Sequence, residues 1–332
     1  YRIRRRPGQL HRTACGARRQ EPVVLQMSFA EQQTWFELLA ASDERGLAEI
    51  AAAAGFGEPR KTAANLCMLN AAFDDQRLIV DITRHALTAA DPDLALNNLE
   101  RLTATVDKSD LAIVLADQTS TDQLLTILGA SPFLTGILCR RAGFFAGLFR
   151  KGQINHAKTQ QQMSDELRQL IDDDADAAGM KKGLRTYKAE EMLRIGSRDL
   201  CGMAELEEVT AELSALAAAS LQRAFEICSV QLKKEYGAPL LDAEEGEAKR
   251  EAEFTILGMG KFGGCELNFS SDIDLIYFYS SDRGQTSGID DPARGRHNRI
   301  SLHQYFVKLS EMITRAIGQA TEDGFVFRVD LR

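Results

Sequence analysis

The sequence predicts an α+β protein, in which a largely helical N-terminal region is followed by a small mixed sheet with helices. Alanine, leucine, glutamate and glutamine dominate residues 28–250, where prolines are sparse. Residues 204–236 carry apolar side chains at steps of three and four, the spacing of one helix face. After residue 253, short β-type runs alternate with glycine-rich turns. The change of pattern indicates an all-helical region beside a mixed α/β unit.

Local signals divide the helical region. Residues 28–54 suggest two short helices, and Ser131-Pro132 places a capping residue and a first-turn proline at the start of another. The longest helix is expected over 204–236 and ends at Gly237. At roughly 50 Å it needs partners along its length, which favours a helical bundle. Its predicted buried stripe consists of Leu206, Val209, Leu213, Leu216, Phe225, Cys228 and Leu232.

The last eighty or so residues show a pattern of short strands and loops in place of the helical pattern before them. We expect strands at 254–257, 272–279 and 325–331, and a polar loop at 280–300. Ser301 is expected to cap an amphipathic helix between that loop and the last strand.

We therefore expect five segments. They are a basic extension (1–26), an N-terminal helical segment (27–85), a helical region (86–241), a polar linker (242–252) and the mixed α/β domain (253–332). Seven arginines stand against one acid in the extension and a methionine follows it, so we expect upstream translation rather than native protein there. The last predicted strand runs to within one residue of the end of the sequence, so we expect the α/β domain to be incomplete at its C-terminal end.

Composition excludes several classes of protein. With 44% hydrophobic and 27% charged residues the chain is neither disordered throughout nor collagen-like. A formal net charge of −8 argues against a general nucleic-acid binder, and no apolar run approaches a membrane span. The six cysteines form no CxxC pair and no zinc spacing, so a reducing, cytoplasmic compartment is expected.

A Gly-x-Gly-x-x-Gly run over 258–263 follows the first predicted strand and invites a dinucleotide-binding interpretation. That interpretation needs a full crossover helix before the next strand. Only the eight residues Gly264 to Ser271 lie between, so we reject it.

The second strand carries better evidence of a site. Side chains alternate along a strand, so Asp272 and Asp274 share one face while Ile273 and Leu275 point to the core. Two adjacent carboxylates repel each other, and a divalent metal removes that cost. Oxygen ligands of this kind suit Mg²⁺.

The third strand repeats the pattern, because Arg328, Asp330 and Arg332 share one face. Three carboxylates can hold two metals around an in-line phosphoryl or nucleotidyl transfer. Gly263-Gly264 lets backbone amides approach phosphate oxygens, and a helix start after them would favour anions.

Two further polar residues are candidates for phosphate binding. Lys261 and Ser271 lie within sequence reach of the same phosphates. An isolated Asp-x-Asp is usually a solvated strand end, and it is the combination of motifs that favours a metal site. Several polar residues precede the long helix, and ion pairing on a helix surface is the default interpretation for them: Arg185, Tyr187, Arg194, Arg198 and Asp199.

Residues 256–276 (ILGMGKFGGCELNFSSDIDLI) resemble the nucleotidyltransferase signature of the bacterial glutamine synthetase adenylyltransferase/adenylyl-removing enzymes, and 323–332 (DGFVFRVDLR) resemble that family's next block. The resemblance implies a DNA polymerase β-like nucleotidyltransferase domain over 253–332. It implies that Asp272, Asp274 and Asp330 are catalytic and bind the metal. It also implies that Gly263, Gly264 and Ser271 line the nucleotide phosphates.

The family carries two such signatures, and Glu266 to Asp274 (ELNFSSDID) is similar to the de-adenylylating one. The resemblance therefore implies removal of AMP from adenylyl-tyrosine on glutamine synthetase by phosphate, giving ADP. Arg328 and Arg332 are candidates for holding the extra phosphate. The alternatives are the ATP-dependent adenylylating activity, or a non-catalytic fragment that docks glutamine synthetase or a PII regulatory protein. ATP, ADP and phosphate are the implied small molecules; neither nucleic acid nor a membrane is expected as a partner.

Overall fold

The computed structural model of the protein describes residues 28–242, 248–292 and 295–332. The expected basic extension (1–26) and residues 243–247 of the expected linker lie outside the described residues. The helices are α1 (Phe29–Ala41), α2 (Glu44–Ala54), α3 (Pro59–Phe73), α4 (Gln76–Ala86), α5 (Pro92–Thr103), α6 (Lys108–Leu115), α7 (Gln118–Ala130), α8 (Pro132–Arg140), α9 (Gly143–Phe145), the π-helix η1 (Ala146–Arg150), the 3₁₀-helix η2 (Gln153–Asn155), α10 (Gln160–Leu170), α11 (Ala177–Leu200), α12 (Leu206–Tyr236), α13 (Gly260–Gly263) and α14 (Leu302–Gly318). The strands are β1 (Pro239–Leu241), β2 (Phe254–Met259), β3 (Ile273–Tyr279), β4 (Gly284–Thr286), β5 (Ile289–Asp291), β6 (Gly295–His297) and β7 (Val329–Leu331).

The chain forms two compact units. The first contains the described residues up to Asn155 together with 196–203, and the second contains 156–195 and 204–332. Much of the expected helical region (86–241) therefore packs in one unit with the α/β segment rather than forming a separate body. The reason is the long apolar face of α12, which shares its core with the sheet and α14.

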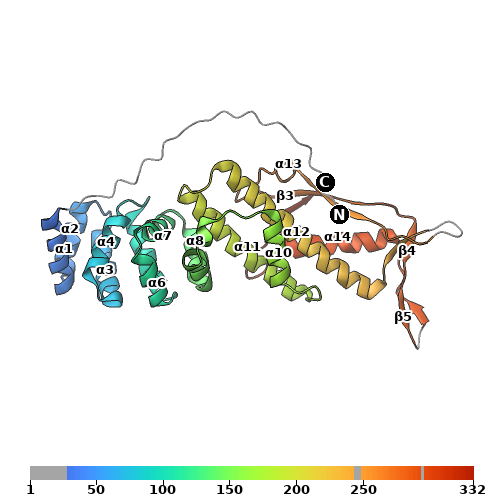
Figure 1. Ribbon diagram of the computed structural model, residues 1–332, viewed down its shortest axis with the longest axis horizontal. Coiled ribbons are helices and arrows are strands. Elements are labelled where there is room, and N and C mark those ends of the chain that lie inside the picture. The colour runs from blue at the N-terminus through green and yellow to red at the C-terminus, as the bar shows by residue number, and fades with distance from the viewer. Residues whose placement is uncertain (1–27, 243–247, 293–294) are drawn as a thin grey trace. The chain divides into compact units, whose positions relative to one another are not determined.

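The first unit is a succession of short helices, α1 to α9, coloured blue to green in Figure 1. Most of these helices begin at a Ser or Asp whose side chain accepts a hydrogen bond from a first-turn amide, as Ser28 does for α1, Asp117 for α7 and Ser131 for α8. The expected pair of helices over 28–54 is confirmed as α1 and α2, with left-handed Gly55 ending the second.

The second unit is built on α10, α11, α12 and α14. Helix α12 packs on α10 and on α14 (Figure 1). Its predicted stripe is buried or half-buried except Leu206, which is 72% exposed because it is the first residue of the helix. Ser301 caps α14 with a reciprocal capping box to Gln304, as the sequence predicts.

The site-bearing sheet has the order β2-β3-β7, with β3 antiparallel to β2 and parallel to β7. This arrangement confirms the rejection of a dinucleotide-binding crossover, since the β2–β3 connection is antiparallel and contains only the single turn α13. The prediction of a strand over 325–331 is wrong in its first half, because pairing starts at Val329. The expected loop at 280–300 contains the short strands β4, β5 and β6.

In the described ranges no single helix is long and apolar enough to cross a membrane. Helices α7 and α8 pass the length and composition test together, but they are bent by 112° and bury their leucines in the core of the first unit.

Candidate functional site

The sheet brings the predicted aspartates to neighbouring positions. Asp274 and Asp330 are direct partners in the parallel pairing of β3 with β7, so their side chains leave the same face of the sheet. Asp272 precedes β3 by one residue and is two positions from Asp274. The alternating Ile273 and Leu275 are fully buried, which fixes the aspartates on the opposite, accessible face.

Two arginines engage these carboxylates. Arg328 forms an ion pair with Asp272 and donates a hydrogen bond to the Ser270 carbonyl at 3.1 Å. Arg332 donates to Oδ1 of Asp274 at 2.8 Å. Both guanidinium groups are more than half exposed, so each pair is weakened by solvent screening and is easily exchanged for another partner.

The glycine run forms a tight turn over the same strand end. Gly260 has a φ of +53°, and a Cβ there would lie 2.9 Å from Oδ2 of Asp274, so the backbone of α13 lies directly beside this carboxylate. A Cβ on Gly263 would lie 2.6 Å from the Gly258 carbonyl oxygen, closer than real Cβ atoms approach. The positive φ therefore favours glycine at position 260, and close backbone approach requires it at position 263.

One sequence expectation about this turn is wrong, and two predicted phosphate-binding residues can be placed in it. No helix begins after Gly264 in the fully described 264–271 segment, so the expected anion-binding helix start is wrong; the one turn of helix is α13 itself. The Ser271 hydroxyl donates to Oδ1 of Asn268 at 2.8 Å and closes a local turn. The Lys261 side chain is exposed on α13.

Three carboxylates leave one face of the sheet in adjacent positions, and oxygen donors of this kind are those that a magnesium ion would need. Their oxygens are not gathered into a ligand set: among residues 28–242, 248–292 and 295–332, no group of three or more His, Cys, Asp or Glu side chains is arranged around a common point. Arg328 and Arg332 supply the positive charge beside the carboxylates in this structure.

Sequence reasoning missed the role of α11. The expectation of surface ion pairs is wrong for Arg185, Tyr187, Arg194 and Arg198, all of which are buried; Asp199 is exposed. The signal that could have indicated burial is that charged and apolar residues of this helix recur on the same faces.

Arg194 belongs to a buried ionic network in the second unit. Its guanidinium donates to Glu191 and, at 2.6 Å, to Glu212. Lys158 donates to Glu191 at 2.7 Å and to Glu166 at 2.8 Å. Burial alone would lower the pKa of Lys158, but the carboxylates outweigh it and raise the pKa. The network therefore holds α10, α11 and α12 together through paired charges.

One hydrogen bond joins α12 to the signature loop. The Leu267 amide donates to Oγ of Ser214 at 3.3 Å, and the Leu267 side chain is fully buried in the core. The longest helix, α12, thus holds the loop that leads into Asp272.

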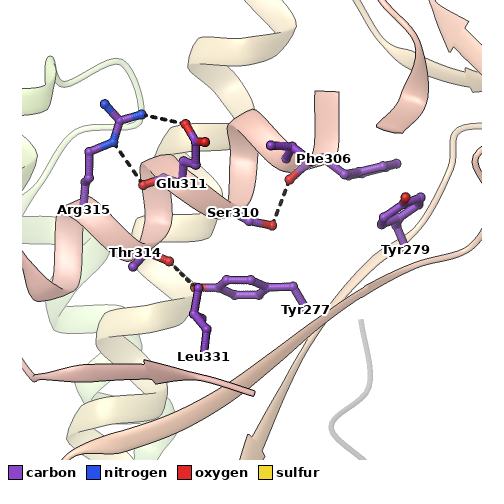
Figure 2. Close-up of a pocket in the computed structure, with 9 residues that line it drawn as sticks. Tyr277, Tyr279, Phe306, Ser310, Glu311, Thr314, Arg315 and Leu331 are labelled. Atoms are coloured by element: carbon purple, nitrogen blue, oxygen red, sulfur yellow. Dashed lines mark hydrogen bonds and ion pairs between the residues drawn. The ribbon is translucent and has the colours of Figure 1, made fainter. Parts of the chain in front are cut away.

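The opposite face of β3 carries a pocket of about 390 Å³, lined largely by apolar atoms. Figure 2 shows Tyr277 and Tyr279 from β3 facing Phe306 and Thr314 of α14, with the Tyr277 hydroxyl 3.0 Å from Oγ1 of Thr314. Because these tyrosines alternate with Asp274 along the strand, the pocket is separate from the carboxylate face.

A mixed sheet with three aspartates beside a glycine turn, packed on long helices, defines an α+β protein with a nucleotidyltransferase-like fold. A family model described as Glutamate-ammonia ligase adenylyltransferase matches residues 121–332. The chain therefore belongs to the glutamate-ammonia ligase adenylyltransferase family of nucleotidyltransferases.

Three relatives, each named bifunctional glutamine synthetase adenylyltransferase/adenylyl-removing enzyme, illustrate the similarity. The chain is 37% identical to the protein of Shewanella loihica over 212 residues (64% of this chain, 21% of the relative). It is 40% identical to that of Burkholderia pseudomallei over 153 residues (46% and 15%) and 33% identical to that of Psychromonas ingrahamii over 240 residues (72% and 24%). The chain spans about a fifth of the length of the first relatives it matches.

Proposed function

We propose that this chain carries the de-adenylylating site of a glutamine synthetase-regulating enzyme. The observation that carries the proposal is the register of Asp274 with Asp330 beside Asp272, under a glycine turn, in a chain of this family. The direction of the reaction rests on the Glu266 to Asp274 segment, which resembles the de-adenylylating signature.

In the proposed reaction an oxygen of inorganic phosphate attacks the phosphorus of adenylyl-tyrosine. The bond from phosphorus to the tyrosine oxygen breaks, the tyrosine oxygen takes up a proton, and ADP leaves. Asp272, Asp274 and Asp330 are the residues proposed to hold Mg²⁺, which when bound would offset charge on the attacking and leaving oxygens.

The cations of the site have a separate role in this proposal. Arg328 and Arg332 extend from the β7 segment beside the aspartates, and their exposed guanidinium groups suit bidentate binding of phosphate oxygens. The lack of side chains at Gly263-Gly264 would let phosphate oxygens come close to the backbone, although the Gly264 amide donates to the Gly260 carbonyl at 3.0 Å in this structure. ATP, ADP and a PII regulatory protein are further proposed partners, on the family resemblance alone.

The test uses the whole natural protein and measures both directions in parallel. Adenylylated glutamine synthetase with Mg²⁺ and phosphate reports ADP release; unmodified synthetase with ATP reports AMP transfer. Asp274→Asn keeps the side-chain shape but removes a charge from the metal ligands. We expect it to abolish ADP release and to leave AMP transfer intact, with Asp282→Asn on the exposed surface as the matched control.

The competing functions give different results. Loss of AMP transfer with retained ADP release would assign the adenylylating activity to this site. Retention of both activities would indicate a docking function and refute the catalytic proposal. A magnesium titration of Asp274→Asn by calorimetry, showing unchanged affinity, would refute the metal assignment separately.

A further inference from the structure

Helix α11 presents a row of cationic side chains to the connection between α14 and β7. Lys181, Arg185 and Lys188 are spaced by four and three residues, which places them on one helix face. All three contact this connection, beginning with Lys181, whose Nζ donates to Oε1 of Gln319 at 2.6 Å. The connection, 319–328, is fully described. It has a turn at 321–324 that a bridge between Thr321 and Gly324 closes, and it pairs with no other strand before Val329.

Arg185 holds the first part of the connection. Its Nε donates to the Gly324 carbonyl at 2.8 Å, and its Nη1 donates to the Ala316 carbonyl at 3.2 Å. Its Nη2 donates to the Gln319 carbonyl. The side chain is only 2% exposed, so this planar fork satisfies carbonyl groups at the end of α14 that have no helical partner.

Lys188 holds the next part, one turn further along α11. Its Nζ donates to the Phe325 carbonyl at 3.2 Å. The same ammonium lies 5.2 Å from the ring centre of Phe325 and 5.8 Å from that of Phe327, within the range of cation–π attraction. Burial lowers the pKa of Lys188 below its ordinary value.

The residues that follow directly are those of the candidate site. The Arg328 carbonyl accepts from the Ile273 amide at 2.9 Å, and Asp330 then pairs in register with Asp274. Strand pairing therefore fixes the chain only from this point onward. Before that point, three kinds of contact set the direction in which the chain enters β7. They are the contacts with α11, the Ile317 carbonyl, which accepts from the Val326 amide at 3.0 Å, and the burial of Val326 and Phe327 in the core.

We propose that Arg185 and Lys188 are positioning residues that set the placement of Arg328 and Asp330 relative to Asp274. The expected effect on ADP release rests on the proposed function, whereas the expected effect on the structure of the β7 segment does not. Within the described part of the chain, neither side chain forms a hydrogen bond or ion pair with the three aspartates. Arg185 acts through the carbonyls of Ala316, Gln319 and Gly324, and Lys188 acts through the Phe325 carbonyl and the rings of Phe325 and Phe327. Helix α11 thereby positions the β7 segment of the site. Helix α12 positions the loop before Asp272, through the hydrogen bond between Ser214 and Leu267.

The test compares Lys188→Met with Lys188→Arg in the whole natural protein. Methionine keeps an unbranched apolar stem but removes the donor and the charge, whereas arginine retains both. Lys182→Met, an exposed lysine on the neighbouring face of α11, is the matched control. Amide hydrogen exchange of 324–332 is measured without substrate, and kcat and KM for phosphate are measured in ADP release.

We expect Lys188→Met to speed exchange in 324–332 about tenfold and to leave β2 and β3 protected as before. The kcat should fall about tenfold with KM changed less than about threefold, because binding groups remain and only their alignment suffers. Lys188→Arg should restore most of both, and Lys182→Met should match the wild type.

Unchanged exchange in 324–332, or an equal loss of protection throughout the second unit, would overturn the positioning role. So would failure of Lys188→Arg to restore kcat. A wild-type protein that releases no ADP would refute the proposed function, while the exchange pattern would still decide whether α11 places β7.

Discussion

Alanine substitution of two adjacent glycines tests the geometry of the signature turn. At Gly263 the added Cβ would meet the Gly258 carbonyl oxygen at 2.6 Å and its carbon at 3.2 Å, both backbone atoms that cannot rotate away. At Gly264 the nearest atom would be Cδ of Glu266 at 3.5 Å, an ordinary contact with a flexible side chain, and φ is −81°. The two substitutions are chemically identical but differ in the space that the fold provides.

The expected magnitudes follow from that difference. Gly263→Ala must push β2 and α13 apart by several tenths of an ångström, and overpacking of this kind costs about 1–3 kcal/mol. Gly264→Ala meets no clash and reduces the freedom of the unfolded chain, so it should be neutral or stabilising by up to about 1 kcal/mol. The displaced turn includes Gly260, which lies against Asp274, so Gly263→Ala should also lower ADP release by about 10- to 100-fold.

The assay has to report on the second unit. The single tryptophan, Trp35, lies in α1 of the first unit, so its fluorescence is a poor probe of the turn. Amide exchange in β2 and β3 is the direct measure, and Gly263→Ala should speed it by about 5- to 150-fold. An equal effect of Gly264→Ala, or no effect of Gly263→Ala, would refute the reasoning from close backbone approach.

Three further predictions concern charges. Arg194→Met should cost about 3–5 kcal/mol of the free energy of unfolding in urea, because it leaves two buried carboxylates without their guanidinium; a cost below about 1 kcal/mol would contradict this. Arg328→Ala should tighten magnesium binding by up to about fivefold in calorimetry by freeing its aspartate partner, and should weaken phosphate binding; weaker magnesium binding would argue against this competition. Burial alone would raise the pKa of Glu226, but hydrogen bonds from Arg168 and its neighbours lower it, so its stabilisation is complete above the unfolded-state pKa and is lost as pH falls through the folded-state pKa. Glu226→Gln should therefore flatten the acid side of a plot of Tm against pH, whereas exposed Glu253→Gln should not.

The carboxylate face was predictable because it depends on short-range alternation. The pattern that buries Ile273 and Leu275 necessarily exposes Asp272 and Asp274, whatever strand lies next to them. The partner strand was harder to delimit. Phe325 and Phe327 are spaced by two as strand residues on one face are, yet their rings lie near the Lys188 ammonium, and pairing begins only at Val329.

The sequence predicted that this region is helical, but it did not predict how the helices are divided between the two compact units. Capping residues and apolar spacing act within one or two turns, so they mark helices such as α14, which Ser301 begins as expected. Which helices share a core depends on contacts between residues far apart in sequence. Helix α12 therefore joined the sheet in one compact unit, although composition had separated them by a polar linker.

The sequence by itself determined that a helical region precedes a mixed α/β region, that a glycine turn follows the first strand of the latter, and which three aspartates lie near one another along the strands. Each of these features is encoded within a few consecutive residues. Tertiary structure alone decided that Asp330 pairs with Asp274 and that arginines engage the carboxylates. It also decided that Arg185 is buried, and Lys188 half-buried, against the β7 connection. The physical reason is that sequence alone predicts a solvent-exposed position for a charged residue on a helix. Only the fold shows which carbonyl groups and aromatic rings lie close enough to bind it. Such partners, more than a hundred positions away in the chain, leave no periodic signal beside it.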